Sequence, residues 1–542
     1  MASLMLGPVL RHVTRETATV WVETDRACTV EVLGHREPTF CVAGHHYALV
    51  CVRGLQPDTS TPYEVLLDGE PVWPAPDSAF PPSRIRTYHP ARPVRISFGS
   101  CRYATEAASG ADEGGYGGDT LDALARALRG RPEAQWPDLL MMLGDQVYAD
   151  ETTEATQARI AARRGLAKPP HGQVADFEEY TWLYHESWSD PEVRWLLSTV
   201  PSAMIFDDHD VHDDWNTSRS WRQDIQATSW WAERITGGLM SYWIYQHLGN
   251  LAPGELDEDK TYAAVRAAGD GEAVLRAFAQ AADREADGAK GARWSHWRDL
   301  GPTRLVVIDS RCGRILDGTR SMLSESEQEW IVARLDGDYD HLLLGTSLPW
   351  LLPPALHAVE AWNERLCEHP ARWRARLGER MRRGADLEHW PAFDASFRWL
   401  AGVVADLGRG AAGREPPATI CVLSGDVHHT YVCEATFDDP VRSRVYQLTC
   451  SPVHNQVPRY MRLAFRLSWS RLAEQAARLV LGRLARVPKP PLSWRRLAGP
   501  VFGNALGSLV LDGRRARLLV ETTAGVPAGH PMRRVISRDL SR

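Results

Sequence analysis

Several apolar segments of this sequence are followed at once by residues that commonly bind metal ions. In chain order these residues are Cys101, Asp145 with Tyr148, Asp208 with His209, and Asp426 with His428. Carboxylates and imidazoles combined with one thiolate and one phenolate suit trivalent iron better than zinc. Oxygen-rich positions also suit calcium or magnesium. Two cations ~3.5–4 Å apart would clamp a phosphate group and generate a hydroxide nucleophile, with Asp145 as the candidate bridging carboxylate.

The segment Pro137–Tyr148 shows this pattern most clearly. Its residues Leu139–Leu143 form an unbroken apolar run, which is typical of a strand buried on both faces. The run ends at Gly144, where the chain can turn, and Asp145 follows directly. Because Asp is also common in ordinary turns, this motif alone could be a turn cap. Its recurrence after three other apolar runs favours a site at the edge of a sheet.

The segment Asp207–Asn216 is rich in residues of the same kind. Eight of its ten residues are Asp, His or Asn, and it follows the apolar run Ala203–Phe206. Carboxylates gathered at the end of a strand repel one another unless a cation is present. A solvated acidic loop is the plain alternative, but the preceding apolar run argues for burial.

The elements that must position these residues divide the chain near residue 90. Residues 1–90 contain short alternating segments separated by turn signals, which predict an all-β sandwich. Leu55-Gln-Pro-Asp, followed by Tyr63-Glu-Val, resembles the signature of fibronectin type III-like domains. The proline-rich segment 71–90 is expected to be a linker. Residues 91–542 alternate apolar strands with helical segments, which predicts an α/β domain that carries the site.

Five motifs occur in the order found in the PhoD-like alkaline phosphatases, which belong to the calcineurin-like metallophosphoesterase superfamily. They are Phe98-Gly-Ser-Cys101, Gly144-Asp-Gln-Val-Tyr148, Asp207-Asp-His-Asp210, Ile308-Asp-Ser-Arg311 and Ser424-Gly-Asp-Val-His428. The chain resembles this family from about residue 90 to 525. The resemblance implies a four-layer α/β/β/α core, preceded here by the fibronectin III-like sandwich, and an iron–calcium phosphoesterase site.

The resemblance also implies roles for single residues. Cys101 and Tyr148 match iron ligands, and Asp145 matches the bridge. Asp208 stands where many members have an Asn ligand, whereas Asp426 and His428 match the last metal-binding motif. His209 matches the residue that contacts the phosphate or protonates the leaving group.

One position departs from the pattern of the superfamily. A further metal-binding His is expected after the strand that ends at Ser347, but Ser347-Leu-Pro-Trp stands there. The identity of the second metal, Ca²⁺ by resemblance, is therefore left open. Arg311 either pairs with Asp309 or holds phosphate through its bidentate fork. We expect His429 and His212 to lie beside the site rather than to serve as ligands.

Composition excludes several classes of protein. The net charge is −7, which argues against a general affinity for nucleic acid. The nine cysteines are dispersed without a CxxC pair, so neither a disulfide scaffold nor a zinc ribbon is indicated. No signal peptide and no apolar stretch of membrane-spanning length is visible, so the expected location is the cytoplasm.

A basic stretch, residues 458–496, stands apart from these motifs. It holds ten Lys or Arg residues against one acid, Glu474, and it also carries large apolar residues. A solvated helix that covers the core is one interpretation. A basic amphipathic lid, which docks on anionic lipid or steers an anionic substrate, is the other.

The sequence thus predicts metal-dependent hydrolysis of phosphate mono- or diesters by a metal-activated hydroxide, with small or polymeric phosphate esters as substrates. His209 and Arg311 are the predicted catalytic residues. Two alternatives remain open: a phospholipid phosphodiesterase that works at a membrane surface, and a non-catalytic binding protein with a degenerate metal site. The oligomeric state is not indicated.

Overall fold

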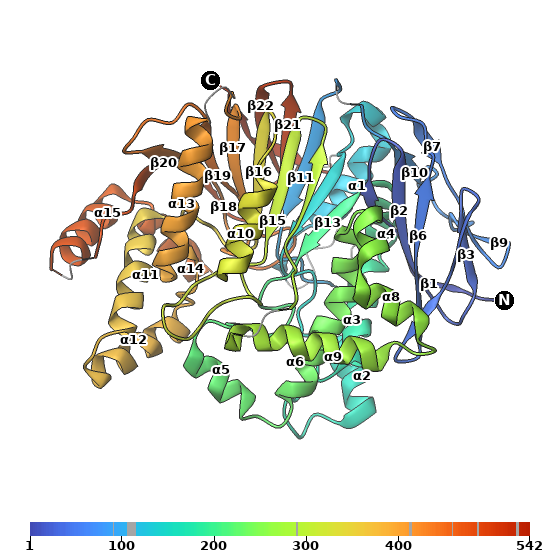
Figure 1. Ribbon diagram of the computed structural model, residues 1–542, viewed down its shortest axis with the longest axis horizontal. Coiled ribbons are helices and arrows are strands. Elements are labelled where there is room, and N and C mark those ends of the chain that lie inside the picture. Colours follow the sequence, from blue (N-terminus) through green and yellow to red (C-terminus); the bar gives the residue numbers. More distant parts are fainter. Residues whose placement is uncertain are drawn as a thin grey trace.

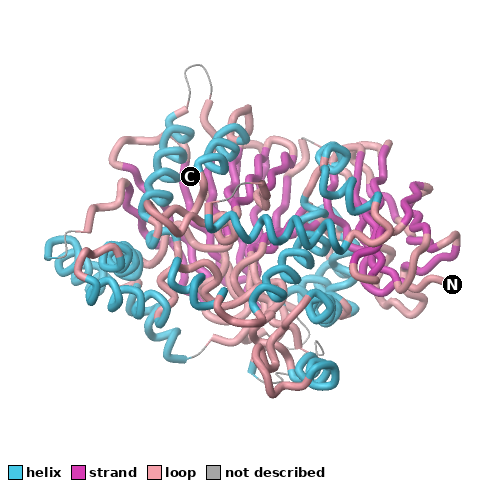
Figure 2. The backbone as a smooth tube through the Cα atoms, turned by 60° about the horizontal axis from the view of Figure 1, so that its bottom comes forward, coloured by secondary structure: helices cyan, strands magenta, loops and turns pink. Residues whose placement is uncertain are grey.

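The computed structural model describes residues 1–541 except 90, 106–114, 289–290, 411–414, 458, 485–486 and 527–530. The core strands lie at the centre between helices, and further strands form the edge of the molecule at the N-terminus, as Figures 1 and 2 show. Among the described residues, no helix is both long and apolar enough to cross a membrane.

The N-terminal part is an all-β sandwich. One sheet has the order β1-β2-β6-β5 and the other β4-β3-β8-β9. The first consists of β1 (Leu4–Val13), β2 (Thr17–Thr24), β6 (His45–Arg53) and β5 (Phe40–Val42); the second of β4 (His35–Pro38), β3 (Thr29–Val32), β8 (Val65–Leu67) and β9 (Glu70–Trp73). Alternate residues of β2, Ala18, Val20 and Val22, face the sandwich core. This strand order is that of immunoglobulin-type sandwiches, so the prediction of a sandwich is confirmed.

The other face of the first sheet packs on the main domain. Trp21 and Tyr47 of this sheet contact Tyr245 at ring-centroid distances of 5.2 and 5.7 Å. Arg11, fully buried, donates hydrogen bonds to the Gln246 carbonyl (2.5 Å) and to Asn250 Oδ1 (3.0 Å). The sandwich therefore packs directly on the larger domain through this face.

The proline-rich segment is more structured than a linker. It contains the end of β9 and also β10 (Arg84–Arg86), which pairs antiparallel with β7 (Ser60–Pro62). The expectation of a plain linker is wrong because a strand can include residues next to proline at a sheet edge. The predicted boundary near residue 90 falls between β10 and the first strand of the core, β11 (Val94–Gly99).

Two mixed sheets form the core. The first has the order β13-β12-β11-β21-β22-β23 and the second β14-β15-β16-β17-β19-β18-β20. Strands β11, β12 (Leu139–Leu143) and β13 (Ser202–Ile205) run parallel, as do β15 (Thr303–Ile308), β16 (His341–Thr346), β17 (Thr419–Ser424) and β19 (Arg444–Thr449). The antiparallel strands are β21 (Ala505–Asp512), β22 (Arg515–Thr522), β23 (Arg533–Asp539), β14 (His296–Leu300), β18 (Thr430–Phe437) and β20 (Leu492–Val501).

The two sheets face each other and each carries helices on its outer face. In β15, Leu305 and Val307 belong to the core cluster shared with the first sheet, whereas Val306 and Ile308 pack with α10 (Glu325–Arg334) and α13 (Asp394–Arg409). Helices α1 (Thr120–Gly130), α3 (Phe177–Trp188) and α4 (Pro191–Thr199) share the core cluster of the first sheet. This is the predicted four-layer α/β/β/α arrangement.

The remaining helices lie in the segments that connect these elements. They are η2 (Glu133–Gln135), α2 (Glu154–Arg164), α5 (Arg219–Gln226), α6 (Trp231–Ser241), η3 (Tyr242–His247), η4 (Leu248–Asn250), α7 (Pro253–Glu258), α8 (Lys260–Ala267), α9 (Glu272–Asp283), η5 (Arg284–Asp287), α11 (Pro354–Cys367), α12 (Arg372–Gly384), η6 (Trp390–Ala392), α14 (Arg459–Ser468), α15 (Arg471–Ala477) and η7 (Arg478–Leu484).

Candidate metal centre

The loops after four parallel strands meet at one edge of the two sheets. The backbone N–H of Cys101, after β11, donates to the carbonyl of Gly144, after β12, at 3.1 Å. The backbone N–H of Asp426, after β17, donates to Ser100 Oγ at 3.1 Å. A Cβ at Gly144 would lie 2.6 Å from the Cβ of Asp207, after β13. Glycine at the end of β12 thus permits the close approach of two acidic loops.

The backbone at the predicted ligands is strained. Cys101, Asp145, Asp426 and His428 have φ angles of 58°, 52°, 63° and 48°, in the left-handed region that non-glycine residues rarely adopt. Each such residue costs on the order of 1–3 kcal/mol and persists only where surrounding contacts hold it. The contacts around these loops therefore hold the four residues in unfavourable backbone conformations.

One buried carboxylate holds two of these loops together. Asp210 Oδ2 accepts hydrogen bonds from the backbone N–H groups of Asp145 and Asp207, both at 2.9 Å. Its Oδ1 accepts from the N–H of Gln146 at 3.2 Å. Burial, the largest effect, raises the pKa of Asp210 to about 7 although these donors favour the charged form. Asp210 therefore fixes the spacing of the candidate ligands.

A compact carboxylate cluster lies between these loops. Ligand atoms of Asp145, Asp207 and Asp208 lie within 4.8 Å of one another, and all three residues are buried. Asp145 Oδ1 and Asp207 Oδ2 have no hydrogen-bond partner among the described residues. Burial raises the pKa of Asp145 well above its usual value; Asp207 and Asp208 add to the shift, which His209 opposes. Buried, unpaired carboxylate oxygens of this kind fit a bound cation.

The predicted iron ligands Cys101 and Tyr148 border this cluster. Cys101 Sγ lies 3.2 Å from Asp145 Oδ2 and accepts a hydrogen bond from Ser451 Oγ at 3.3 Å. Burial and the neighbouring carboxylate of Asp145 raise the pKa of the Cys101 thiol well above its usual value. The Tyr148 hydroxyl accepts a hydrogen bond from Asn455 Nδ2 at 2.8 Å. A thiol in such a negative field is ionised only when a cation compensates the charge.

His209, one of the two predicted catalytic residues, lies at the solvent-facing side of the carboxylate cluster. His209 is partly exposed; its Nδ1 lies 3.0 Å from Asp150 Oδ1, and its ring packs 4.8 Å from that of Tyr148. Burial favours the neutral ring, but the Asp150 carboxylate, with Asp208 and Asp145, raises the pKa of His209 well above its usual value. The raised pKa favours the protonated ring, which is the form that a proton donor requires.

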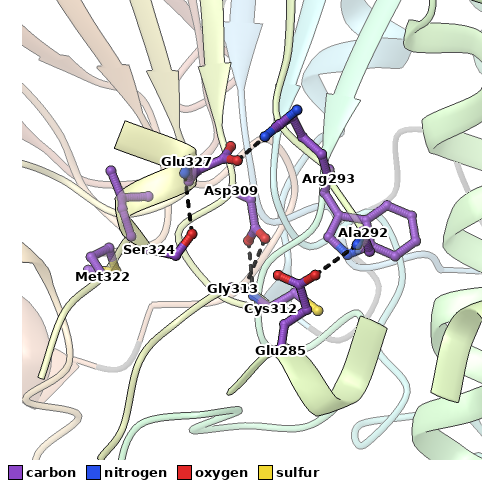
Figure 3. Close-up of a pocket in the computed structure, with 11 residues that line it drawn as sticks. Glu285, Ala292, Arg293, Asp309, Cys312, Gly313, Met322, Ser324 and Glu327 are labelled. Atoms are coloured by element: carbon purple, nitrogen blue, oxygen red, sulfur yellow. Dashed lines mark hydrogen bonds and ion pairs between the residues drawn. The ribbon is translucent and has the colours of Figure 1, made fainter. Parts of the chain in front are cut away.

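Arg311 sits at the opposite side of the cluster, at the end of β15. The Asp309 carboxylate shapes this turn by accepting the backbone N–H groups of Arg311 (2.8 Å), Cys312 (2.9 Å) and Gly313 (3.1 Å). Figure 3 shows Asp309 pointing at Gly313 beside a small pocket that Glu285 and Glu327 also line. Burial raises the pKa of Asp309 to about 6. Asp309 therefore acts on the backbone, and the guanidinium is free to point elsewhere.

Three carboxylates surround the guanidinium of Arg311. It forms ion pairs with Asp207, with Glu388 (Nη1–Oε2 2.5 Å) and with Asp208 (Nη2–Oδ1 3.1 Å). Arg311 is fully buried. The expected alternative of an ion pair between Arg311 and Asp309 is therefore wrong. The guanidinium instead compensates part of the charge of the carboxylate cluster.

Asp426 and His428 stand somewhat apart. Among the described residues, the groups placed to bind a cation are Asp145-Asp207-Asp208 and Asp208-His209-Asp213, and neither includes them. Asp426 Oδ2 lies 2.8 Å from His389 Nε2, and the other ring nitrogen of His389 lies 2.7 Å from Glu360 Oε1. Burial opposes ionisation of Asp426, but the bond to His389 lowers its pKa below the usual value.

Several residues that shape the site were not singled out from the sequence. Asp207 and Asp210 lay inside the recognised acidic segment, and Asp150 follows Tyr148 by two positions, so proximity was an available signal. Glu388 and His389 follow a helix, and Asn455 lies six residues after the end of β19, so none of them stands directly at a strand end. His389 approaches Asp426, whereas Ser347, where a histidine was expected, bonds to Ser310 Oγ at 2.8 Å.

The two histidines expected beside the site lie there. His429 Nδ1 bonds to the Val427 carbonyl at 2.7 Å, and its ring packs 4.3 Å from Phe465. His212 Nδ1 bonds to the Asp213 carbonyl at 2.8 Å, and its ring stacks on Trp230. Neither belongs to a cation-binding group of the described residues.

Comparison with known proteins supports these observations. A family model described as PhoD-like phosphatase matches residues 122–338, and one described as a domain of unknown function (DUF7800) matches residues 1–85. No curated protein matches the chain. A solved structure titled "Structure of PhoD" matches with a TM-score of 0.56 and 11% sequence identity, over 98% of this chain and 92% of that chain. The resemblance carried by the strand-end motifs is thus confirmed: residues 122–338 match a PhoD-like phosphatase model, and the chain shares the fold of PhoD.

Proposed function

We propose that this protein is a metal-dependent phosphoesterase that hydrolyses phosphate mono- or diesters. The observation that carries the proposal is the buried cluster Asp145-Asp207-Asp208, whose unpaired oxygens lie beside His209 in a segment that matches a PhoD-like phosphatase model. A buried group of like charges is costly unless a cation compensates it. A cation bound at this edge of the sheets would provide that compensation.

The residues divide into two candidate sets of metal ligands. Cys101, Tyr148 and Asp145 offer a thiolate, a phenolate and a carboxylate, the donors that suit Fe³⁺. Asp145, Asp208, Asp426 and His428 offer mainly oxygen donors, for which Ca²⁺ is the proposed second metal. When bound, such cations polarise a phosphoryl oxygen and lower the pKa of water.

The chain itself supplies proton transfer and positioning. His209, held by Asp150 with the ring protonated, is placed to donate a proton from Nε2 to the leaving-group oxygen. Arg311 remains the proposed phosphate contact: a cation at Asp207 and Asp208 would compete for these carboxylates and leave guanidinium N–H groups available for an anionic substrate.

Purified protein tests the proposal directly. We expect turnover of aryl phosphate mono- or diesters that a chelator abolishes and added metal restores, together with stoichiometric iron and calcium by elemental analysis. The matched control for Asp145→Asn is Asp257→Asn, an exposed carboxylate in the N-terminal half. Full activity in Asp145→Asn, or no metal-dependent turnover in the wild type, would refute the proposal.

The two alternatives make different predictions. A non-catalytic binding protein with a degenerate site would contain no stoichiometric metal. A phospholipid phosphodiesterase would hydrolyse a diester in a vesicle faster than the same headgroup diester in solution, and this difference would depend on residues 458–496.

A further inference from the structure

Large hydrophobic side chains that are exposed to solvent gather at one end of the molecule. Eight of the twelve found among the described residues lie on α12, α14, α15 and η7. They are Trp373, Leu377, Tyr460, Leu463, Leu467, Leu472, Leu479 and Val480. Single exposed apolar residues are common, but a concentration of this kind marks an interaction surface.

Helix α14 has two apolar stripes instead of one. Met461 and Phe465 of α14, with Trp469 directly after its end, are spaced four apart and form the inner stripe. Phe465 packs on the ring of His429, and Trp469 Nε1 lies 3.4 Å from His429 Nε2. Leu463 and Leu467 form an outer stripe and are 60% and 57% exposed. The inner stripe already anchors the helix on the core, so the outer one remains available to a partner.

The same helices are strongly basic. The segment Arg372–Gly384 holds six Arg and one acid, Glu379, and the segment Arg459–Leu484 also holds six Arg and one acid, Glu474. On α12, Arg374 and Arg376 are exposed on either side of Trp373 and Leu377; on α14 and α15, Arg466 and Arg471 are exposed near Leu467 and Leu472. This charge contrasts with the net charge of −7 for the whole chain.

Both basic segments pack on a single helix. Helix α11 contacts α12, α14, α15 and η7. Figure 1 shows these helices together at the end of the molecule opposite the N-terminal sandwich. The two segments, about ninety residues apart in sequence, therefore contribute to one basic and apolar end of the protein, here called the basic end.

We propose that the basic end docks on the surface of an anionic phospholipid membrane. Arginines attract anionic headgroups, and neighbouring Trp, Tyr and Leu side chains insert at the boundary between headgroups and acyl chains. Lipid is favoured over nucleic acid because the exposed residues between the arginines are mainly leucines, which neither stack on bases nor form hydrogen bonds with them.

The basic end is connected directly to the candidate metal centre. Glu388 and His389, which contact Arg311 and Asp426, follow the end of α12 at Gly384 by a few residues. Asn455, which donates to the Tyr148 hydroxyl, precedes the start of α14 by four residues. Docking would thus order the helices that carry these loops.

Vesicle co-sedimentation tests the proposal without requiring turnover, so its failure is distinguishable from failure of the proposed enzyme activity. The probes are vesicles of phosphatidylcholine alone and with about 30 mol% phosphatidylserine. We expect the full chain to bind only the anionic vesicles and to be released at about 0.5 M salt, where the Debye length is a few ångström. Equal binding to both vesicles, or none, would overturn the proposal.

Paired variants locate the contact. R374E with R376E, and R466E with R471E, should each weaken partition into anionic vesicles on the order of thirtyfold, since two arginines leave the membrane surface in each case. L463S with L467S should also weaken it but should keep its dependence on salt. Thermal unfolding of each variant shows that the fold is retained.

Two matched controls lie elsewhere on the surface. Arg26→Glu, whose side chain is 62% exposed in the sandwich, and Val332→Ser, 49% exposed on α10, should leave vesicle binding unchanged. Wild-type binding in both arginine pairs would overturn the proposal. So would a dimeric chain that L463S with L467S converts to a monomer, because the outer stripe would then be an interface between copies.

Discussion

The two core sheets contribute unequal halves to the candidate site. The loops after the first sheet bring Asp145, Asp207 and Asp208 together with oxygens that lack partners. The loop after β17 of the second sheet brings Asp426, whose carboxylate is already bonded to His389. The carboxylates of the first half fit a bound cation, whereas the Asp426 carboxylate of the second half is already held by His389. The first half therefore needs a positive charge from outside the chain more than the second half does.

The largest expected effect concerns the first half. Asp145→Asn should lower turnover at least about a thousandfold, because the proposed bridge contributes several kcal/mol to transition-state charge stabilisation. The same change should raise the melting temperature of metal-free protein, because it removes a charge from a buried acidic cluster. Kinetics and calorimetry together check both signs. A lower melting temperature would indicate that the cluster is not strained by its own charge.

The proton donor should have an effect that depends on the substrate. His209→Asn or Asp150→Asn should slow hydrolysis of esters with poor leaving groups by about 10²–10⁴-fold, the usual contribution of general acid catalysis. Esters of strongly acidic phenols need no proton and should be affected much less. A uniform loss across a series of leaving groups would contradict the assigned role.

The second half should show a smaller effect. His389→Gln or Glu360→Gln should weaken metal affinity by about 10–100-fold, the usual effect of losing a group that orients a ligand. Chelator titration followed by elemental analysis measures this loss. His357→Gln is a matched control, because His357 is also buried on α11 but faces the ring of Phe397. Equal metal loss in both variants would indicate a general packing defect.

The smallest expected effect is selective for iron. Tyr148→Phe should lower iron content and visible absorption while it leaves calcium content close to that of the wild type, because only the phenolate is lost. Elemental analysis and an absorption spectrum measure the two metals separately. Equal loss of both metals would place Tyr148 in a structural role.

The stability of the metal-free protein should also depend on pH. Burial raises the pKa of Asp210 to about 7. A carboxyl with a raised folded pKa binds more protons when folded, so stability falls as pH rises from about 4 through 7. Metal-free protein should therefore melt at lower temperature at pH 8 than at pH 6. Saturating metal should reduce this difference, as thermal scans at both pH values would show.

Strand-end chemistry could be read from the sequence because an apolar run fixes where a buried strand stops. Asp145 and Asp208 were therefore predicted as candidate ligands from local pattern alone. His389 and Asn455 could not be found in this way, because each follows or precedes a helix and reaches the site only through tertiary packing. The ion pairs of Arg311 with Asp207, Asp208 and Glu388 likewise depend on distances that no spacing encodes.

The packing of the sandwich on the main domain could not be predicted from the sequence either. The alternation of β2 predicts two faces, yet nothing local shows that the face with Trp21 packs on a helix more than two hundred residues away. The proline-rich segment 71–90 was misjudged for the same reason: its strands exist because they pair with β7 and β8.

The buried arginine of the sandwich has a consequence for biosynthesis. Arg11 is synthesised before its acceptors Gln246 and Asn250, which follow more than two hundred residues later in the chain. At about 5–20 residues per second, roughly 10–50 s separate them. Once the strands up to β10 have been made, Trp21, Tyr47 and the Arg11 guanidinium lie on an uncovered face of the sandwich until residues 245–250 follow. Chaperones could bind this face of the nascent chain during that interval. Synonymous codons between residues 90 and 250 would set how long the face stays exposed.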